Sequence, residues 1–261
     1  MSYNQVNLYN LDIHIAEIYD QQVNYSDDVQ LLLDLIGPKG PLRIFEPFCG
    51  TGRILIPLIM AGHQLIGLDQ SKVLLNCCKE KLNHMGKQAM LVEGDALDYS
   101  WPDGLDLVVL GGNCLYELAN TDEQERCIQF AALALKPGGF LFLDNDHMED
   151  ALAQSWQDPT ARTSFPSGLC ADGVRLESTI QTIWVNVSAR LARFRRQTKV
   201  IYPDGRIVER AYIQQKHPIS TGELKIWLEK HGFTIEQLYG TWKREFYTDT
   251  SPRAIFWAKK I

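Results

Sequence analysis

The chain has 261 residues, enough for one large α/β domain with an insertion or for two small domains. With 45% hydrophobic and 22% charged residues, its composition is that of a globular protein with a full core. The formal net charge of −6 argues against a basic surface for nucleic acid. No secretory signal and no membrane-spanning apolar run is visible, so we expect a cytoplasmic protein with neither a nucleic-acid nor a membrane partner. The six cysteines form no CxxC pair, so we expect reduced thiols and no metal site.

From Leu42 onward, short apolar runs alternate with helix-like stretches, which is typical of βαβ units around a parallel sheet. Strands are expected at 42–46, 64–69, 89–92, 105–110 and 140–144. Helices are expected at 53–61, at 71–84 with Ser71 as N-cap, and at 121–135, where Lys136-Pro137-Gly138-Gly139 ends the helix. The strands are almost continuously apolar, as they would be with helices on both faces. The pattern predicts a doubly wound α/β sheet.

The rhythm changes after residue 146. Residues 151–172 look irregular, and three long strands are then expected at 174–187, 189–202 and 206–214. A Pro-Asp-Gly turn at 203–205 joins the last two, so the strands should form an antiparallel sheet. A helix at 220–231 and strands at 234–241 and 253–259 follow. We expect an N-terminal helical cap over 1–41, a core over 42–150 and 215–261, and an antiparallel insertion over 151–214 that acts as a lid or a dimer contact.

One segment places a strand, a carboxylate, a Gly-Thr-Gly turn and a helix in succession. The strand ends at Glu46, and glycines at 50 and 52 allow a tight turn and close approach of a ligand. The second strand ends in Asp69, where a carboxylate should bond ribose hydroxyls. Asp95 follows the third strand. Acidic residues at the carboxyl ends of three successive strands predict a ligand-binding crevice.

This pattern resembles the class I S-adenosylmethionine-dependent methyltransferases, and the resemblance covers nearly the whole chain from Leu42. It implies a Rossmann-like seven-stranded sheet, here with the three-strand insertion, an enzymatic methyl transfer, and S-adenosylmethionine as cofactor. The family usually carries Asp at the position of Glu46 and a small residue at that of Phe48, so the turn is expected to be shaped differently.

The resemblance implies a role for each strand-end residue. Glu46 is expected near the methionine amino group, with Gly50 and Gly52 beneath the methionyl and ribose portions. Asp69 is expected to hold the ribose hydroxyls, and Asp95 the adenine amino group. The remaining expected cofactor contacts flank these positions: Thr51, Arg53, Gln70, Ser71, Ala96, Leu97 and Gly111.

Three alternatives to a small-molecule methyltransferase stay open. A dinucleotide-dependent oxidoreductase would carry a third glycine where Leu55 stands. The run Glu46–Gly52 is similar to the turn of methyltransferases that act on base amines, but those enzymes carry an Asn/Asp-Pro-Pro-aromatic motif after the fourth strand. The segment Gly111–Leu118 here is more similar to that of small-molecule enzymes such as glycine N-methyltransferase. A non-catalytic protein that binds the same cofactor is the third alternative.

The acceptor side is less sharply defined. Tyr19 and Tyr25 lie in a segment similar to the Tyr-Asp lead-in of the small-molecule enzymes, which implies that they face methionine or acceptor; packing against the sheet is an equal alternative. We expect Asn113, His147 and Tyr19 as catalytic residues, and Tyr25, Tyr116 and Asn145 as acceptor contacts. His147 could accept a proton near neutral pH, although a turn residue is the commoner role for a lone histidine. A cluster of arginines in the insertion reads as a solvated face, and a monomer or homodimer is expected.

Overall fold

The computed structural model describes residues 8–38, 40–147, 154 and 156–261. The chain divides into two compact units, which are described separately. The core unit comprises the described residues of Tyr25–Met148 and Ile219–Ile261. The insertion unit comprises the described residues of Met1–Asn24 and Glu149–Pro218. The expected N-terminal cap is therefore divided between the units: its first helix belongs with the insertion and its second with the core.

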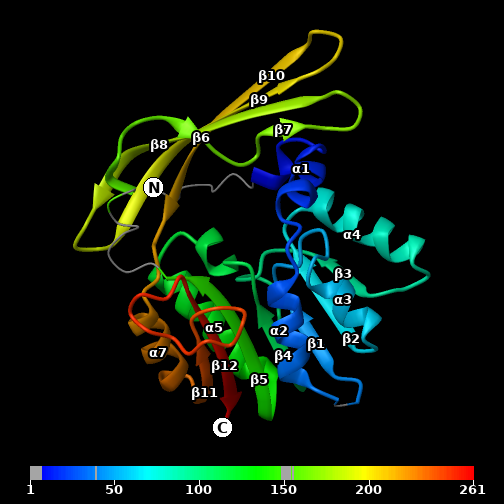
Figure 1. Cartoon of the computed structure of the whole chain (residues 1–261), viewed down its shortest axis with the longest axis vertical. Helices are drawn as coiled ribbons and strands as arrows, with labels where there is room; N and C mark the ends of the chain where they lie inside the picture. Colours follow the sequence, from blue (N-terminus) through cyan, green and yellow to red (C-terminus); the bar gives the residue numbers. More distant parts are fainter. Residues whose placement is uncertain (1–7, 39, 148–153, 155) are drawn as a thin grey trace. The chain divides into compact units, whose positions relative to one another are not determined.

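The core unit contains the expected seven-stranded sheet (Figure 1). Its strand order is β11-β12-β5-β4-β1-β2-β3. Strands β1 to β5 run parallel, whereas β12 is antiparallel to both β5 and β11. The strands are β1 Arg43–Glu46, β2 Gln64–Asp69, β3 Met90–Glu93, β4 Leu105–Leu110, β5 Leu135–Asp146, β11 Phe233–Tyr239 and β12 Arg253–Lys260. This confirms the fold predicted from the alternation of elements.

Helices cover both faces of this sheet. On one face, Ile44, Val109 and Phe142 join an apolar cluster with residues of α2, α3 and α4. On the other, Phe45 packs edge-on against Trp101, whose ring in turn contacts a phenylalanine of α5. The helices of the core are α2 Asp27–Ile36, α3 Leu55–Met60, α4 Lys72–His84, α5 Thr121–Ala134 and α7 Thr221–Lys230, with a 3-10 turn η2 at Cys114–Glu117. Successive residues of a strand point to opposite faces, so one face of β1 meets each helical layer.

Local signals place most helix boundaries. The Ser71 hydroxyl accepts the Leu74 N–H, which makes Ser71 the N-cap of α4 as predicted. Ser220 and Glu223 form a capping box at the start of α7. Most other boundaries shift by one or two residues, as at α3, which begins at Leu55 rather than at residue 53. The largest difference is at β5, which begins at Leu135, before the Pro-Gly-Gly turn, with an irregular register opposite β4.

The insertion unit contains an antiparallel sheet. Its three long strands, β8 Arg175–Asn186, β9 Leu191–Ile201 and β10 Ile207–Lys216, confirm the sequence prediction. Two short strands, β6 Arg162–Thr163 and β7 Gly168–Leu169, also pair with β8 in the segment expected to be irregular. Helix α1 (Ile15–Gln22) follows a 3-10 turn η1 (Leu8–Asn10) and packs Ile15 and Ile18 into an apolar cluster with the sheet. The described helices include none long and apolar enough to cross a membrane.

Candidate active site

The expected cofactor residues meet at one edge of the core sheet. Strands β4, β1, β2 and β3 are neighbours, and parallel strands end at the same edge. Glu46 and Asp69 are the last residues of β1 and β2, and Asp95 lies just after β3. The fold therefore brings together the three acidic strand ends predicted from the sequence.

Glu46 is buried, with 4% of its surface exposed. The backbone N–H of Leu55 donates a hydrogen bond to the carboxylate, but Oε2 is buried and has no hydrogen-bond partner in the described part of the chain. Burial raises the pKa of Glu46 well above its ordinary value; the Arg53 charge opposes this rise, and the Asp28 and Asp69 carboxylates add to it. A buried carboxylate with an unused oxygen is stabilised by any cation that reaches it.

The Gly-Thr-Gly turn depends on its glycines. Gly50 and Gly52 have φ values of 52° and 84°, a region that disfavours side chains. A Cβ on Gly52 would also lie 2.6 Å from the Cys78 sulfur on α4. The turn is thus pressed against α4, and Gly52 serves close packing in addition to any ligand approach. Thr51 is fully buried, and its carbonyl accepts the Lys81 ammonium at 3.2 Å.

Asp69 connects two of the turns. Its Oδ2 accepts the Gly50 N–H at 2.9 Å and its Oδ1 accepts the Ser71 N–H at 2.8 Å. Burial raises the pKa of Asp69 to about 6, against the lowering effect of these two bonds. A carboxylate has about four acceptor positions, so capacity remains for hydroxyl donors. Ser71 itself is fully buried and uses its hydroxyl as the cap of α4.

The loop after β3 is tied to the loop after β2. Gln70 donates from Nε2 to Asp95 Oδ2 at 2.6 Å, and the Leu97 N–H binds Asp95 Oδ1 at 2.8 Å. The Trp101 indole donates to the Ala96 carbonyl at 2.8 Å. These bonds fix the position of the loop in which the resemblance places the adenine ring.

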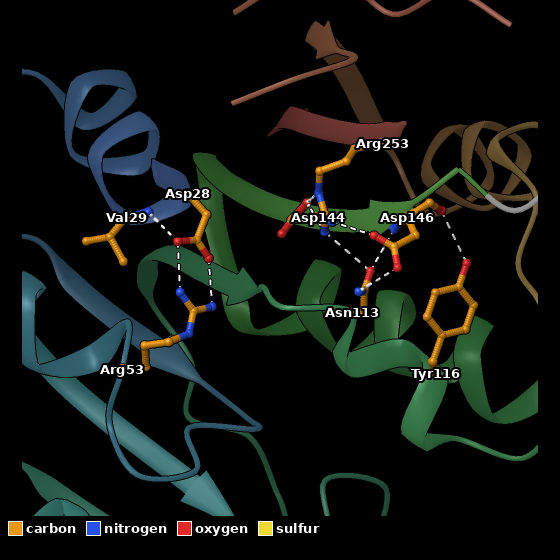
Figure 2. Close-up of polar contacts among 8 residues, drawn as sticks. All are labelled: Asp28, Val29, Arg53, Asn113, Tyr116, Asp144, Asp146 and Arg253. Carbon is orange, nitrogen blue, oxygen red and sulfur yellow. Dashed lines mark hydrogen bonds and ion pairs between the residues drawn. The ribbon is translucent and has the colours of Figure 1, made fainter. Parts of the chain in front are cut away.

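Arg53 forms an ion pair that the sequence analysis did not foresee. Its two terminal nitrogens donate to both oxygens of Asp28 on α2, at 2.8 and 2.7 Å (Figure 2). The Asp28 side chain has no exposed surface. Arg53 Nη1 also donates to the Tyr25 carbonyl, and its guanidinium lies 4.4 Å from the centre of the Tyr25 ring. Asp28 alone reads as an ordinary acidic residue in the first turn of a helix, so no local signal marked it.

Asn113 joins the ends of β4 and β5. Its φ of 62° places it in the left-handed region, and its side chain exchanges two hydrogen bonds with Asp146. Arg253 of β12 binds both Asp144 and Asp146 on the same edge (Figure 2). The aromatic ring of Trp242 lies 4.6 Å from the Arg253 guanidinium. Asp144, Trp242 and Arg253 were not foreseen, because their partners come from strands far apart in the chain.

Two expected catalytic or acceptor residues stand in the core with structural partners. The Tyr116 hydroxyl donates toward the carbonyls of Asp146 and Ile219, at 3.3 and 3.4 Å. Those residues lie at the two places where the chain leaves and re-enters the core. His147 Nδ1 lies 3.0 Å from the Tyr247 hydroxyl. Catalytic or acceptor-binding roles for Tyr116 and His147 stay predictions.

The remaining expected acceptor residues are more dispersed. Asn145 is 1% exposed, and both amide atoms lack a hydrogen-bond partner. Strand alternation directs its side chain to the face opposite that of Asp144. Tyr25 stacks on Trp242 with ring centroids 4.9 Å apart. Tyr19 belongs to the insertion unit, where its ring packs edge-on against Tyr9 and Phe165.

The insertion arginines have partners within their own unit. Arg190 donates to the Pro218 carbonyl, and the Arg193 guanidinium lies over the Trp184 ring. Arg196 Nε donates to Gln214 at 2.7 Å. Beside the core edge, burial raises the pKa of the Cys49 and Cys114 thiols well above the ordinary value, so neither is a thiolate nucleophile near neutral pH.

Comparison with known proteins supports the family assignment. Residues 44–139 match the family described as "Methyltransferase domain". A solved S-adenosylmethionine-dependent methyltransferase from Clostridium acetobutylicum has a similar fold over 97% of this chain and 99% of that one, with a TM-score of 0.76 and 14% identity. Residues 44–139 therefore carry a methyltransferase domain, and the fold of the chain is that of solved S-adenosylmethionine-dependent methyltransferases.

Two curated relatives match part of this chain. The "Cypemycin N-terminal methyltransferase" of Streptomyces sp is 30% identical over 107 residues, 41% of this chain and 43% of the relative. The "Glycine N-methyltransferase" of Rattus norvegicus is 29% identical over 154 residues, 54% of this chain and 53% of the relative. The chain thus spans about half the length of these relatives.

Proposed function

We propose that this protein transfers a methyl group from S-adenosylmethionine to a small-molecule acceptor. The observation that carries the proposal is Glu46: a buried carboxylate with an unused oxygen, directly before a Gly-Thr-Gly turn. The methionine ammonium of the cofactor fits this oxygen by charge and by hydrogen-bonding capacity. The fit carries the proposal because no side chain among the described residues satisfies that oxygen.

The other strand ends suit the rest of the cofactor. Asp69 retains acceptor capacity for ribose hydroxyls, and the ordered loop at Asp95 offers a site for the adenine. Thr51, Arg53 and Ser71 have structural partners, so we propose that they support the turns and that any cofactor contact comes mainly from their backbone. We also propose that Gly111, which follows β4, contacts the cofactor through its backbone.

When bound, S-adenosylmethionine supplies an electrophilic methyl group on a sulfonium. The residues of the chain contribute by holding the acceptor in line with that group. Proximity and orientation alone can lower the activation free energy of such a transfer by about 7–11 kcal/mol. Asn113 is suited to a positioning role, since it is held rigidly by Asp146 beside the end of β4. Tyr25 and Tyr116 remain our proposed acceptor neighbours.

The names of the two curated relatives refer to the N-terminus of cypemycin and to glycine. Both support a small acceptor over a nucleic-acid base, as does the acidic net charge of −6. We retain the expectations of a cytoplasmic monomer or homodimer as proposals.

Calorimetric titration with S-adenosylhomocysteine tests the proposal. We expect binding by the parent protein and a loss of about tenfold to a hundredfold in Glu46→Gln, because a charged hydrogen bond is replaced by a neutral one. Glu236→Gln is the matched control, since Glu236 lies on β11 with its side chain 41% exposed. Equal affinity in all three proteins would remove the Glu46 assignment. Binding of S-adenosylmethionine without formation of S-adenosylhomocysteine across an acceptor screen would favour a binding protein.

A further inference from the structure

A second buried carboxylate with an unused oxygen lies at the same edge of the core. Asp144, near the end of β5, has no exposed side-chain surface. Its Oδ1 accepts Arg253 Nε and lies 2.7 Å from Arg253 Nη2, whereas its Oδ2 has no hydrogen-bond partner among the residues that the structure describes. An unpaired buried carboxylate oxygen is costly unless a ligand satisfies it.

Asp144 and Glu46 share one face of the sheet. Ile44 and Phe142 precede them by two positions on β1 and β5, and both belong to the apolar cluster under α2, α3 and α4. Because strand side chains alternate, Glu46 and Asp144 point to that face too. Strand β4 lies between β1 and β5. From a spacing of about 4.8 Å between strands, the two carboxylates are about 10–12 Å apart at the backbone, close enough to bind different parts of one reacting pair.

The charges at this edge leave an excess of carboxylate. Asp28 is matched by Arg53 in a two-bond pair, but Asp144 and Asp146 share the single guanidinium of Arg253 (Figure 2). Glu46 is a further carboxylate, for which the cofactor ammonium provides a match under the proposed function. The sulfonium and carboxylate of S-adenosylmethionine offset one another. Within the described residues, Arg253 is the basic side chain that binds the Asp144–Asp146 pair, so one negative charge of the pair remains unmatched there.

We propose that Asp144 Oδ2 binds the ammonium group of an aliphatic amine acceptor and takes its proton. The proposal rests on the proposed function and names the acceptor class. In this step an N–H bond of the ammonium breaks and an O–H bond forms at Asp144. The nitrogen regains its lone pair, and the methyl group then passes from sulfur to nitrogen as the C–S bond breaks. Asp144 is thus a catalytic residue of the proposed reaction.

Asp144 suits this task better than its neighbour Asp146. The Asp146 side chain is 42% exposed, and its oxygens already bind Arg253 and Asn113. Burial raises the pKa of Asp144, and the carboxylates of Asp28 and Asp146 add to the rise while Arg253 opposes it. The other titratable groups that sense the Asp144 charge are Tyr25 and Cys114. A carboxylate whose pKa is raised is a stronger base than a carboxylate in water.

The test follows the Asp144 carboxyl carbon directly. Protein carrying ¹³Cγ-labelled aspartate, saturated with S-adenosylhomocysteine, is titrated with methylammonium chloride as the smallest amine probe. We expect a saturable shift of the Asp144 signal below about 0.1 M probe, a range in which affinities near 1 mM are resolved. Binding should weaken as the pH falls through the pKa of Asp144. An Asp144 signal unmoved at the highest probe concentration would overturn the proposal.

Two variants separate this role from a structural one. Asp144→Asn and Asp146→Asn make the same change in two ligands of Arg253. We expect Asp144→Asn to weaken methylammonium binding at least about tenfold and Asp146→Asn to change it less than about threefold. Equal loss in both variants would overturn the proposal. Calorimetry with S-adenosylhomocysteine on the same samples reports folding and cofactor binding. If the parent protein does not bind S-adenosylhomocysteine, the proposed function is contradicted. If it binds S-adenosylhomocysteine but does not respond to methylammonium, only this inference is contradicted.

Discussion

Asn113 and Asp146 exchange two hydrogen bonds across the ends of β4 and β5. The Asp146 N–H donates to Asn113 Oδ1 at 2.6 Å, and Asn113 Nδ2 donates to Asp146 Oδ2 at 3.0 Å. Asn113 holds a left-handed backbone conformation, which asparagine tolerates better than most residues. Asn113 therefore ties the loop after β4 to the end of β5 beside the candidate site.

We expect Asn113→Ala to lower the free energy of unfolding by about 2–3 kcal/mol, because it removes two hydrogen bonds and places alanine in a disfavoured conformation. Asn113→Gly keeps the conformation and loses only the bonds, so it should cost about 1 kcal/mol less. Urea unfolding of the three proteins measures both differences. Equal stability of the alanine and glycine variants would show that the backbone conformation is not the constraint we describe.

The Arg53–Asp28 pair provides a second prediction. Arg53→Met leaves the Asp28 carboxylate buried without its cation, and we expect a loss of about 3–5 kcal/mol in the free energy of unfolding. Adding Asp28→Asn to that variant should restore a large part of the loss, because the uncompensated charge is gone. A double-mutant cycle by urea unfolding checks this. Additive effects of the two substitutions would contradict the coupling.

The raised pKa of Asp69 predicts a pH-dependent affinity for the cofactor. The ionised carboxylate accepts hydroxyl hydrogen bonds, and below about pH 6 it is protonated in the free protein. Binding must then release that proton, so we expect the affinity for S-adenosylhomocysteine to fall by up to about tenfold per pH unit below pH 6. Calorimetry between pH 5 and 8 measures the slope. In Asp69→Asn the affinity should be lower at pH 8 and its pH dependence less steep, and what remains comes from Glu46, whose pKa is also raised by burial. An unchanged slope in that variant would assign the whole effect to a group other than Asp69.

The insertion is expected to serve methyl transfer more than cofactor binding. Replacing residues 174–214 with a short Gly/Ser linker should leave S-adenosylhomocysteine affinity within about threefold, because Glu46, Asp69 and Asp95 lie in the other unit. Ile15 and Ile18 of α1 lose their apolar partners in this variant, so serine replaces both. If the insertion acts as the lid expected from the sequence, methyl transfer to an acceptor found by screening should fall by more than about tenfold, because a lid excludes water from the reaction. A folded deletion variant with the parental rate would rule out the lid.

Much of the fold could be read from short stretches of sequence. The βαβ rhythm, the N-cap at Ser71 and the three long strands after residue 170 follow from local period and turn chemistry. The segment expected to be irregular contains two short strands, β6 and β7. They were not predicted because a two-residue strand shows no alternation of apolar and polar residues and is defined only by the strand with which it pairs. The acidic residues at the strand ends could be predicted for the same reason as the strands, because each lies at a fixed place relative to a local sequence pattern.

The sheet type, the glycine turn and the carboxylates at the ends of β1, β2 and β3 are predictable from the sequence, because these features depend on neighbours within a few positions. Which charged side chains pair with one another depends on the tertiary fold. Arg53 pairs with Asp28 on a helix that comes earlier in the chain. Arg253 pairs with Asp144 because β12 lies antiparallel beside β5. Strand alternation then selected Asp144 over Asn145 as the residue facing the same side as Glu46. Pairing across a sheet depends on strand order and register, which no local pattern records.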